Sequence, residues 1–198
     1  MKYSIRSNTF HNSFPKFLSS YGFTLIELLI SISILLITTL MTLPSLSSIL
    51  TNSRQDGQIA TLMSNLQLTR KEAIYKNRNM LMCKSSDQLT CSKDAQWHEG
   101  WVIFYDANNN KQRDEDEKIV FAQAKTNHTI KVVYNSFGGS NNYVYFYNRG
   151  YSHTNGTFTI CNPLGTQHTK TIVISRTGRV RLDEKPKSSY QKKCLAQV

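Results

Sequence analysis

The chain has 198 residues, with 24 Lys and Arg against 13 Asp and Glu, and a formal net charge of +11. Its five His residues are scattered and no Ser/His/Asp or Cys/His constellation is visible, so we expect no enzymatic activity and no cofactor. The positive charge favours a polyanionic partner, namely nucleic acid, an anionic polysaccharide or a membrane, although a merely soluble surface carries similar charge.

An apolar run extends from Phe23 to Leu43 and ends at Pro44, with Glu27 as its only charged residue. At ~1.5 Å per residue such a helix is roughly 31 Å long, enough to cross the hydrocarbon core of a bilayer. We therefore predict a membrane-spanning helix over residues 23–52, kinked where Pro44 removes a backbone hydrogen bond. Residues 1–22 carry basic but no acidic side chains, so they should stay in the cytoplasm and the rest of the chain should lie outside.

The segment from Gly22 to Glu27, Gly-Phe-Thr-Leu-Ile-Glu, resembles the processing site of type IV pilins and pseudopilins. The resemblance implies that residues 1–22 are a leader, that prepilin peptidase cuts between Gly22 and Phe23, and that Phe23 is then N-methylated. Glu27 would lie one helical turn from the new amine, on the same face, where it can pair with the amine of a neighbouring pilin during assembly. The alternative is an ordinary signal anchor with Glu27 near the lipid headgroups.

Residues 53–198, about 145 in number, are enough for one globular domain with its own core. Residues 53–79 should continue the helix, because apolar side chains recur at helical spacing. These are Ile59, Leu62, Met63, Leu66, Ala73 and Ile74. Short β-like runs follow, at residues 80–83, 100–105, 118–123, 130–134, 143–147, 157–161, 171–175 and 179–182. Runs this short favour antiparallel pairing, so we predict an α+β fold with a long N-terminal helix packed on one or two antiparallel sheets.

Four cysteines lie in the part predicted to be exported. An even number in an oxidising compartment predicts two disulfides, for which three pairings are possible. We favour Cys83–Cys91, which would close a local loop, and Cys161–Cys194, which would hold the C-terminal tail. A zinc site is disfavoured because no pair has Cys-x-x-Cys spacing.

Residues 106–117 have the composition of a calcium loop. Oxygen-bearing side chains occupy its positions 1, 3, 5, 9 and 12, namely Asp106, Asn108, Asn110, Asp114 and Glu117. Position 6, however, is Lys111 instead of glycine, and no flanking helices are predicted. We therefore favour a solvated hairpin turn without a metal, since Asn and Asp are common in turns for backbone reasons.

Tyr143, Tyr145 and Tyr147 alternate along a predicted strand and should share one face of it. Such a row could stack the bases of a single nucleic-acid strand. We favour the alternative, in which the row is half core and half sheet surface.

The last two predicted strands enclose a turn with the sequence Arg-Thr-Gly at residues 176–178. Side chains two residues apart on a strand point the same way, so Arg179 and Arg181 should face solvent together while Val180 and Leu182 face the core. With Arg176 at the turn, and with Lys185 and Lys187 in the tail, they would form a basic end of the molecule.

Several segments together resemble the GspH/FimT family of minor pilins and pseudopilins. These are residues 66–79, the Trp97–Trp101 run around Gly100, residues 155–161, and the Gly-Arg-Val-Arg of residues 178–181. The last of these resembles the motif of family members that bind DNA in natural transformation. The resemblance implies a minor pilin that binds extracellular DNA through its phosphates, largely independently of sequence, with Arg176, Arg179, Arg181, Lys185 and Lys187 as contacts.

The alternative within the same family is a minor pseudopilin of the type II secretion system, a structural subunit of a filament tip. In either case the resemblance implies three further partners: other pilins in a filament, prepilin peptidase, and the bacterial inner membrane before assembly. The protein would cross that membrane once, with a periplasmic C-terminal domain, and for a type IV pilin would then move to an extracellular pilus.

Overall fold

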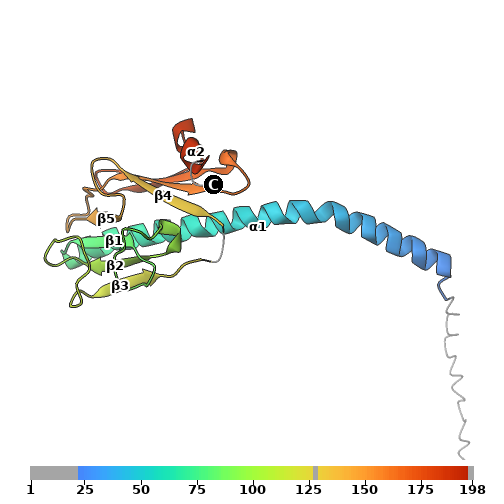
Figure 1. Ribbon diagram of the computed structural model, residues 1–198, viewed down its shortest axis with the longest axis horizontal. Coiled ribbons are helices and arrows are strands. Elements are labelled where there is room, and N and C mark those ends of the chain that lie inside the picture. The colour runs from blue at the N-terminus through green and yellow to red at the C-terminus, as the bar shows by residue number, and fades with distance from the viewer. Residues whose placement is uncertain (1–21, 127–128, 196–198) are drawn as a thin grey trace, which may run out of the picture. The chain divides into compact units, whose positions relative to one another are not determined.

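The computed structural model describes residues 22–126 and 129–195, without the side chains of residues 40–45 (Figure 1). Except for Gly22, the predicted leader lies outside the described residues. The chain divides into two compact units, Met1–Leu43 and Pro44–Val198. The long helix α1, Leu25–Lys76, contributes to both and is continuous past Pro44, and the kink predicted there stays a prediction.

The first unit contains the beginning of α1. Thr24 caps this helix, because its Oγ1 accepts a hydrogen bond from the N–H of Glu27 at 3.3 Å. Large apolar side chains between Phe23 and Ile37 are 47–80% exposed. The hydroxyls of Ser31 and Ser33 donate to carbonyl oxygens one turn earlier, each at 2.7 Å. Apart from Glu27, the exposed surface of this segment is therefore mainly apolar, and these two hydroxyls are satisfied within the helix.

No helix among the described residues is both long enough and apolar enough to cross a bilayer. The membrane-spanning helix expected over residues 23–52 stays a prediction.

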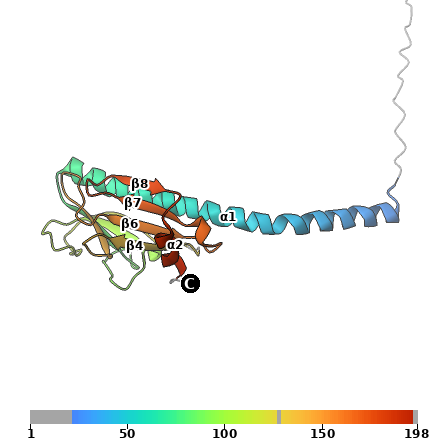
Figure 2. The same ribbon diagram turned by 90° about the horizontal axis from the view of Figure 1, so that it is seen from above.

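The second unit contains the rest of α1 and eight described strands in two antiparallel sheets. The first sheet has the order β3-β2-β1-β5, with bounds Ile119–Gln123, Trp101–Tyr105, Met80–Lys84 and Tyr143–Phe146. The second has the order β4-β6-β7-β8, with bounds Lys131–Ser136, Gly156–Cys161, Lys170–Ile174 and Val180–Asp183. Figure 2 shows these last four strands side by side. The predicted α+β architecture is confirmed.

One hydrophobic core joins α1 to both sheets. Leu62 and Leu66 of α1, Trp101 of the first sheet and Phe158 of the second belong to the same cluster and are 0–1% exposed. Burying each of these side chains contributes roughly 1.5–3 kcal/mol, so the helix is fixed to the sheets mainly by this contact. Ile74, which the helical spacing also assigned to the apolar stripe, is 49% exposed instead.

Both favoured disulfides are present. Cys83 bonds to Cys91 with a Cα–Cα distance of 5.6 Å, and Cys161 bonds to Cys194 with a distance of 5.5 Å. The second bond anchors a short helix that the sequence analysis did not predict, α2, Ser188–Leu195. A helix of eight residues is marginal by itself, so this covalent anchor and the packing of α2 on β6 are what hold it.

Candidate nucleic-acid interface

The predicted basic hairpin is formed by β7, β8 and the turn between them. Ser175 and Arg179 close this turn, with the N–H of Ser175 donating to the carbonyl oxygen of Arg179 at 3.0 Å. Gly178 has a φ of +77°, a backbone conformation that favours glycine. Beyond the turn, Arg181 is paired with Val173 and Val180 with Ile174. We call residues 175–181 the arginine hairpin.

The side chains of β8 alternate as predicted. Val180 and Leu182 are partly buried against the hydrophobic core, whereas Arg179 and Arg181 are exposed. The strand begins at Val180, so Arg179 is the last residue of the turn instead of the first of the strand. Among the described residues, no Asp or Glu oxygen lies within 4.0 Å of the guanidinium groups of Arg176, Arg179 or Arg181. Their charge is therefore available to an external anion.

Arg70 of α1 holds the arginine hairpin in place. Its Nε donates to the carbonyl oxygen of Gly150 at 2.9 Å, and its Nη2 donates to that of Thr177 at 3.3 Å. One guanidinium therefore joins the helix, the loop after β5 and the hairpin turn. Sequence reasoning missed this role, because the three segments are far apart in the chain.

A groove of about 450 Å³ lies between α1 and the arginine hairpin. Its lining comprises Gln67, Arg70, Lys71, Ile74, Tyr75, Gly178, Arg179 and Val180. Three of these side chains are cationic, so the groove extends the basic surface of the hairpin onto the helix. Lys71 was not predicted as a site residue. It follows Arg70 on α1, and both side chains line the helical side of the groove.

The lysines of the tail are arranged differently from the prediction of one basic end. Lys185 and Lys187 are exposed, but neither is among the residues that line the groove. The N–H of Lys185 donates to Asp183 Oδ1 at 3.1 Å, which brings a carboxylate into the same turn. Arg176, Arg179 and Arg181 are therefore the stronger part of the predicted set.

The charge pattern of the chain offers a signal that the sequence analysis did not use. Residues 118–182 contain no Asp or Glu and eight Lys or Arg. This stretch supplies β3 to β7, the arginine hairpin and the loops between them. Most of the second sheet therefore adds only positive formal charge, which strengthens the attraction for a polyanion.

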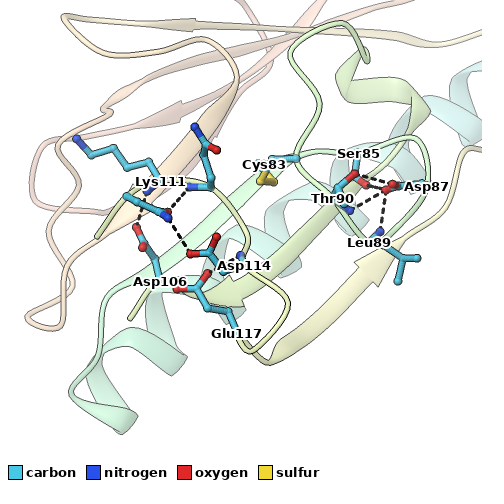
Figure 3. Close-up of a disulfide and its surroundings, with 12 residues drawn as sticks. Cys83, Ser85, Asp87, Leu89, Thr90, Asp106, Lys111, Asp114 and Glu117 are labelled. Carbon is cyan, nitrogen blue, oxygen red and sulfur yellow. Dashed lines mark hydrogen bonds between the residues drawn. A yellow bond between two sulfur atoms is a disulfide. The ribbon is translucent and has the colours of Figure 1, made fainter. Parts of the chain in front are cut away.

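The loop of residues 106–117 connects β2 to β3, which pair as antiparallel neighbours. The predicted hairpin turn is thus confirmed. Figure 3 shows Asp106, Asp114 and Glu117 turned toward the loop's own polar groups. Lys111 N–H donates to Asp106 Oδ2 at 3.2 Å, and Ala107 N–H donates to Glu117 Oε1 at 2.7 Å.

Asp114 Oδ2 accepts from the side-chain amides of Asn108 and Asn110, both at 2.7 Å. All five oxygen-bearing residues of the calcium-like pattern therefore take part in hydrogen bonds within the loop. Burial raises the pKa of Asp106. Among the described residues, no group of three or more His, Cys, Asp or Glu side chains is arranged to hold a metal ion.

The three alternating tyrosines, Tyr143, Tyr145 and Tyr147, do not form an exposed row on the sheet surface. Tyr145 is 3% exposed, and its hydroxyl donates to Asn109 Oδ1 at 2.8 Å. Tyr143 and Tyr147 are partly buried against it. The favoured interpretation, half core and half surface, is confirmed.

A capped N-terminal helix packed on two antiparallel sheets, with an apolar first segment, defines a type IV pilin-like subunit. Residues 58–178 match the family described as type II transport protein GspH, and residues 18–43 match the prokaryotic N-terminal methylation motif. The chain belongs to the GspH family, whose members include minor pilins and pseudopilins.

Two solved structures are similar to this chain at low sequence identity. The type IV minor pilin FimU of Pseudomonas aeruginosa is 18% identical, with a TM-score of 0.51 over 66% of this chain and 89% of that one. The minor pseudopilin EpsH of the Vibrio cholerae type 2 secretion system is 11% identical, with a TM-score of 0.46 over 65% and 95%. No curated protein matches the chain.

Proposed function

We propose that this protein is a non-enzymatic minor type IV pilin that binds extracellular DNA for uptake in natural transformation. The observation that carries the proposal is the pair of exposed guanidiniums at Arg179, which ends the turn, and Arg181, which lies on the outer strand β8. Neither has an acidic partner among the described residues. Arg176 at the turn, and Arg70 and Lys71 in the adjoining groove, extend this charge. Several cations on one surface can neutralise several phosphates together.

Binding through phosphates, without reading base sequence, follows from the shape of the site. Arginine forks match the geometry of phosphate oxygens, and each neutralised phosphate releases counterions. Base edges are read from the major groove by an inserted helix or a two-stranded ribbon with several aimed polar side chains. The arginine hairpin presents charged side chains at its turn and outer strand, which suit phosphates. The short helix α2 is held on β6 by its disulfide, so it is not free to enter a groove of the DNA.

We propose that the first unit is inserted in the membrane before assembly and forms part of a helical filament core afterwards. Its exposed apolar surface suits either a lipid environment or a bundle of such helices. We propose cleavage between Gly22 and Phe23, methylation of Phe23, and pairing of Glu27 with the Phe23 amine of a neighbouring subunit. Mass spectrometry of the mature N-terminus tests this, because a Gly22→Ala variant that still begins at Phe23 contradicts it.

The DNA-binding proposal is tested by titrating labelled duplexes with the full-length protein in a non-ionic detergent at several salt concentrations. Replacing Arg179 and Arg181 together by Gln should weaken binding and lower the slope of log affinity against log salt by ~0.9 for each lost phosphate contact, or nearly 2 in all. The melting temperature should not change, because both side chains face water. Scrambling the DNA sequence should have little effect.

A matched control removes the same charge elsewhere. Lys93 and Lys118 are exposed and, like the two arginines, have no acidic partner among the described residues, and replacing both by Gln should change affinity and slope much less. Equal losses in the two double variants would mean that net charge alone drives binding. Unchanged affinity and slope in the arginine variant would exclude the hairpin as the site.

The second candidate is a minor pseudopilin of the type II secretion system, which the description of the matching family favours. Such a subunit would recruit proteins to a filament tip and would not need DNA. If the wild type does not bind duplex DNA at low salt, this second function replaces the first.

A further inference from the structure

Beside the arginine hairpin, three tyrosine rings form a graded series from the core to the surface. Tyr145 is buried and contacts Tyr147 edge to face, with 5.0 Å between ring centroids and an interplanar angle of 81°. Tyr147 stacks in turn on Tyr151, with 4.4 Å between centroids and an angle of 20°. Tyr151 is 44% exposed. One face of its ring therefore lies against Tyr147.

The backbone holds this outermost ring in place. The N–H of Tyr147 donates to the carbonyl oxygen of Tyr151 at 3.0 Å, and the N–H of Gly150 donates to that of Tyr147 at 2.7 Å. Gly150 has a φ of +79°, which lets the chain reverse between the two tyrosines. The stacked pair is therefore fixed by a tight turn, and ordering it for a ligand costs little conformational entropy. We call residues 147–152 the tyrosine loop.

The tyrosine loop and the arginine hairpin are bonded to each other. The N–H of Ser152 donates to the carbonyl oxygen of Arg176 at 3.0 Å, one residue from Tyr151 and within the hairpin turn. Arg70 joins the same two segments through the carbonyl oxygens of Gly150 and Thr177. The tyrosine loop also carries the exposed side chain of Arg149 and contains no acidic residue. An aromatic ring and several guanidiniums thus belong to one connected surface.

We propose that Tyr151 stacks an unpaired base of single-stranded DNA whose phosphates are held by the arginine hairpin. The inference rests on the proposed function and specifies its ligand. In a duplex the bases are stacked on each other and unavailable to a ring on the protein surface, whereas an unpaired strand presents its bases beside its phosphates. Aromatic stacking tolerates any base, so the site stays independent of sequence.

The test compares three labelled ligands of equal length with the full-length protein: a single strand, an abasic strand and a duplex. The wild type should bind the single strand more tightly than the abasic strand, and Tyr151→Ala should remove that difference. One stacked base contributes a factor of roughly 5 to 150 in affinity. Tyr151→Trp should keep the difference. Binding of duplex by Tyr151→Ala should match that of the wild type.

A control aromatic is available in Phe137, which is 63% exposed in the loop between β4 and β5. Phe137→Ala should leave all three affinities unchanged. Equal binding of the single strand and the abasic strand by the wild type overturns the stacking proposal while leaving duplex binding, and hence the proposed function, intact. If the wild type binds none of the three ligands, both proposals fail.

Discussion

Gly178 lies so close to Gly150 that a β-carbon at position 178 would overlap the carbonyl oxygen of Gly150. The same oxygen accepts the hydrogen bond from Arg70. The glycine of the Gly-Arg-Val-Arg motif is therefore required by two conditions, its positive φ and the absence of space beside it. The position of both exposed arginines depends on this contact.

Replacing Gly178 by Ala should destabilise the protein and weaken DNA binding. Alanine at a positive φ costs about 1–2 kcal/mol, and the clash with a backbone oxygen adds to this. Gly138→Ala is the control, because Gly138 has a φ of +88° with no atom within 4 Å of its built β-carbon. Thermal unfolding should show a larger loss for Gly178→Ala than for Gly138→Ala. Equal losses of thermal stability in the two variants would mean that the arginine hairpin can move away from Gly150 at no cost in free energy.

Arg70→Lys should lower stability although it keeps the charge. Lysine cannot present two donors in the fixed fork that reaches Gly150 and Thr177, and we expect a loss of about 1 kcal/mol in the free energy of unfolding. The affinity for duplex DNA should fall as well, because the arginine hairpin is less well placed. Lys71→Arg, which exchanges the neighbouring cation in the opposite direction, should leave the free energy of unfolding unchanged. Unchanged stability in Arg70→Lys would show that the two hydrogen bonds do not hold the hairpin.

Removing the Cys161–Cys194 disulfide should cost more than removing Cys83–Cys91. The sequence separations are 33 and 8 residues, and the chain-entropy estimate gives about 3.7 and about 2.5 kcal/mol for loops of these sizes. Paired Cys→Ala variants, compared by denaturant unfolding, measure the difference. Loss of the Cys161–Cys194 bond should also raise amide hydrogen exchange in α2, with little change in β1. A larger loss from the Cys83–Cys91 pair would contradict this order.

Asp87 should keep its loop closed well below pH 4. Hydrogen bonds from the Thr90 hydroxyl and from the backbone N–H of Thr90, with smaller contributions from Leu89 and Ser85, hold the pKa of this carboxyl below its ordinary value of 3.8 (Figure 3). Because the folded pKa is lowered, the stabilisation is fully present above about pH 4 and is lost as the pH falls through the folded value.

The amide shifts of Leu89 and Thr90, followed by NMR between pH 1 and pH 5, should titrate with a midpoint well below 3.8. Thr90→Val removes the hydroxyl that makes the largest contribution, so it should raise the midpoint. A wild-type midpoint at or above 3.8 would contradict the hydrogen bonding described.

Local patterns predicted the elements of the fold closely. The strand expected at residues 171–175 is found at Lys170–Ile174, and that expected at 179–182 is found at Val180–Asp183. Alternation along β8 correctly assigned its exposed and buried side chains, since this depends only on the geometry of one strand. Helix α2 was missed, because eight mostly polar residues have little helical tendency without the disulfide and the sheet beneath them.

The candidate site could be predicted only in part. The exposure of Arg179 and Arg181 follows from the local sequence pattern. The contact of Arg70 with Gly150, however, spans 80 positions and depends on how the strands are ordered. The stacking of Tyr147 on Tyr151 also escaped prediction, because it is made by a turn after β5 ends, not by the strand itself. These two contacts depend on packing between segments that local sequence patterns do not relate to each other.

The outer position of β8 in its sheet has a consequence for how copies of this protein behave at high concentration. Among the described strands, this one pairs with β7 on one side and has no neighbour on the other. Such an edge can recruit a strand of another molecule and start aggregation, and charged side chains along it oppose that pairing. Arg179 and Arg181 therefore keep crowded subunits from joining edge to edge, and a variant that neutralises both should be watched for self-association as well as for lost affinity.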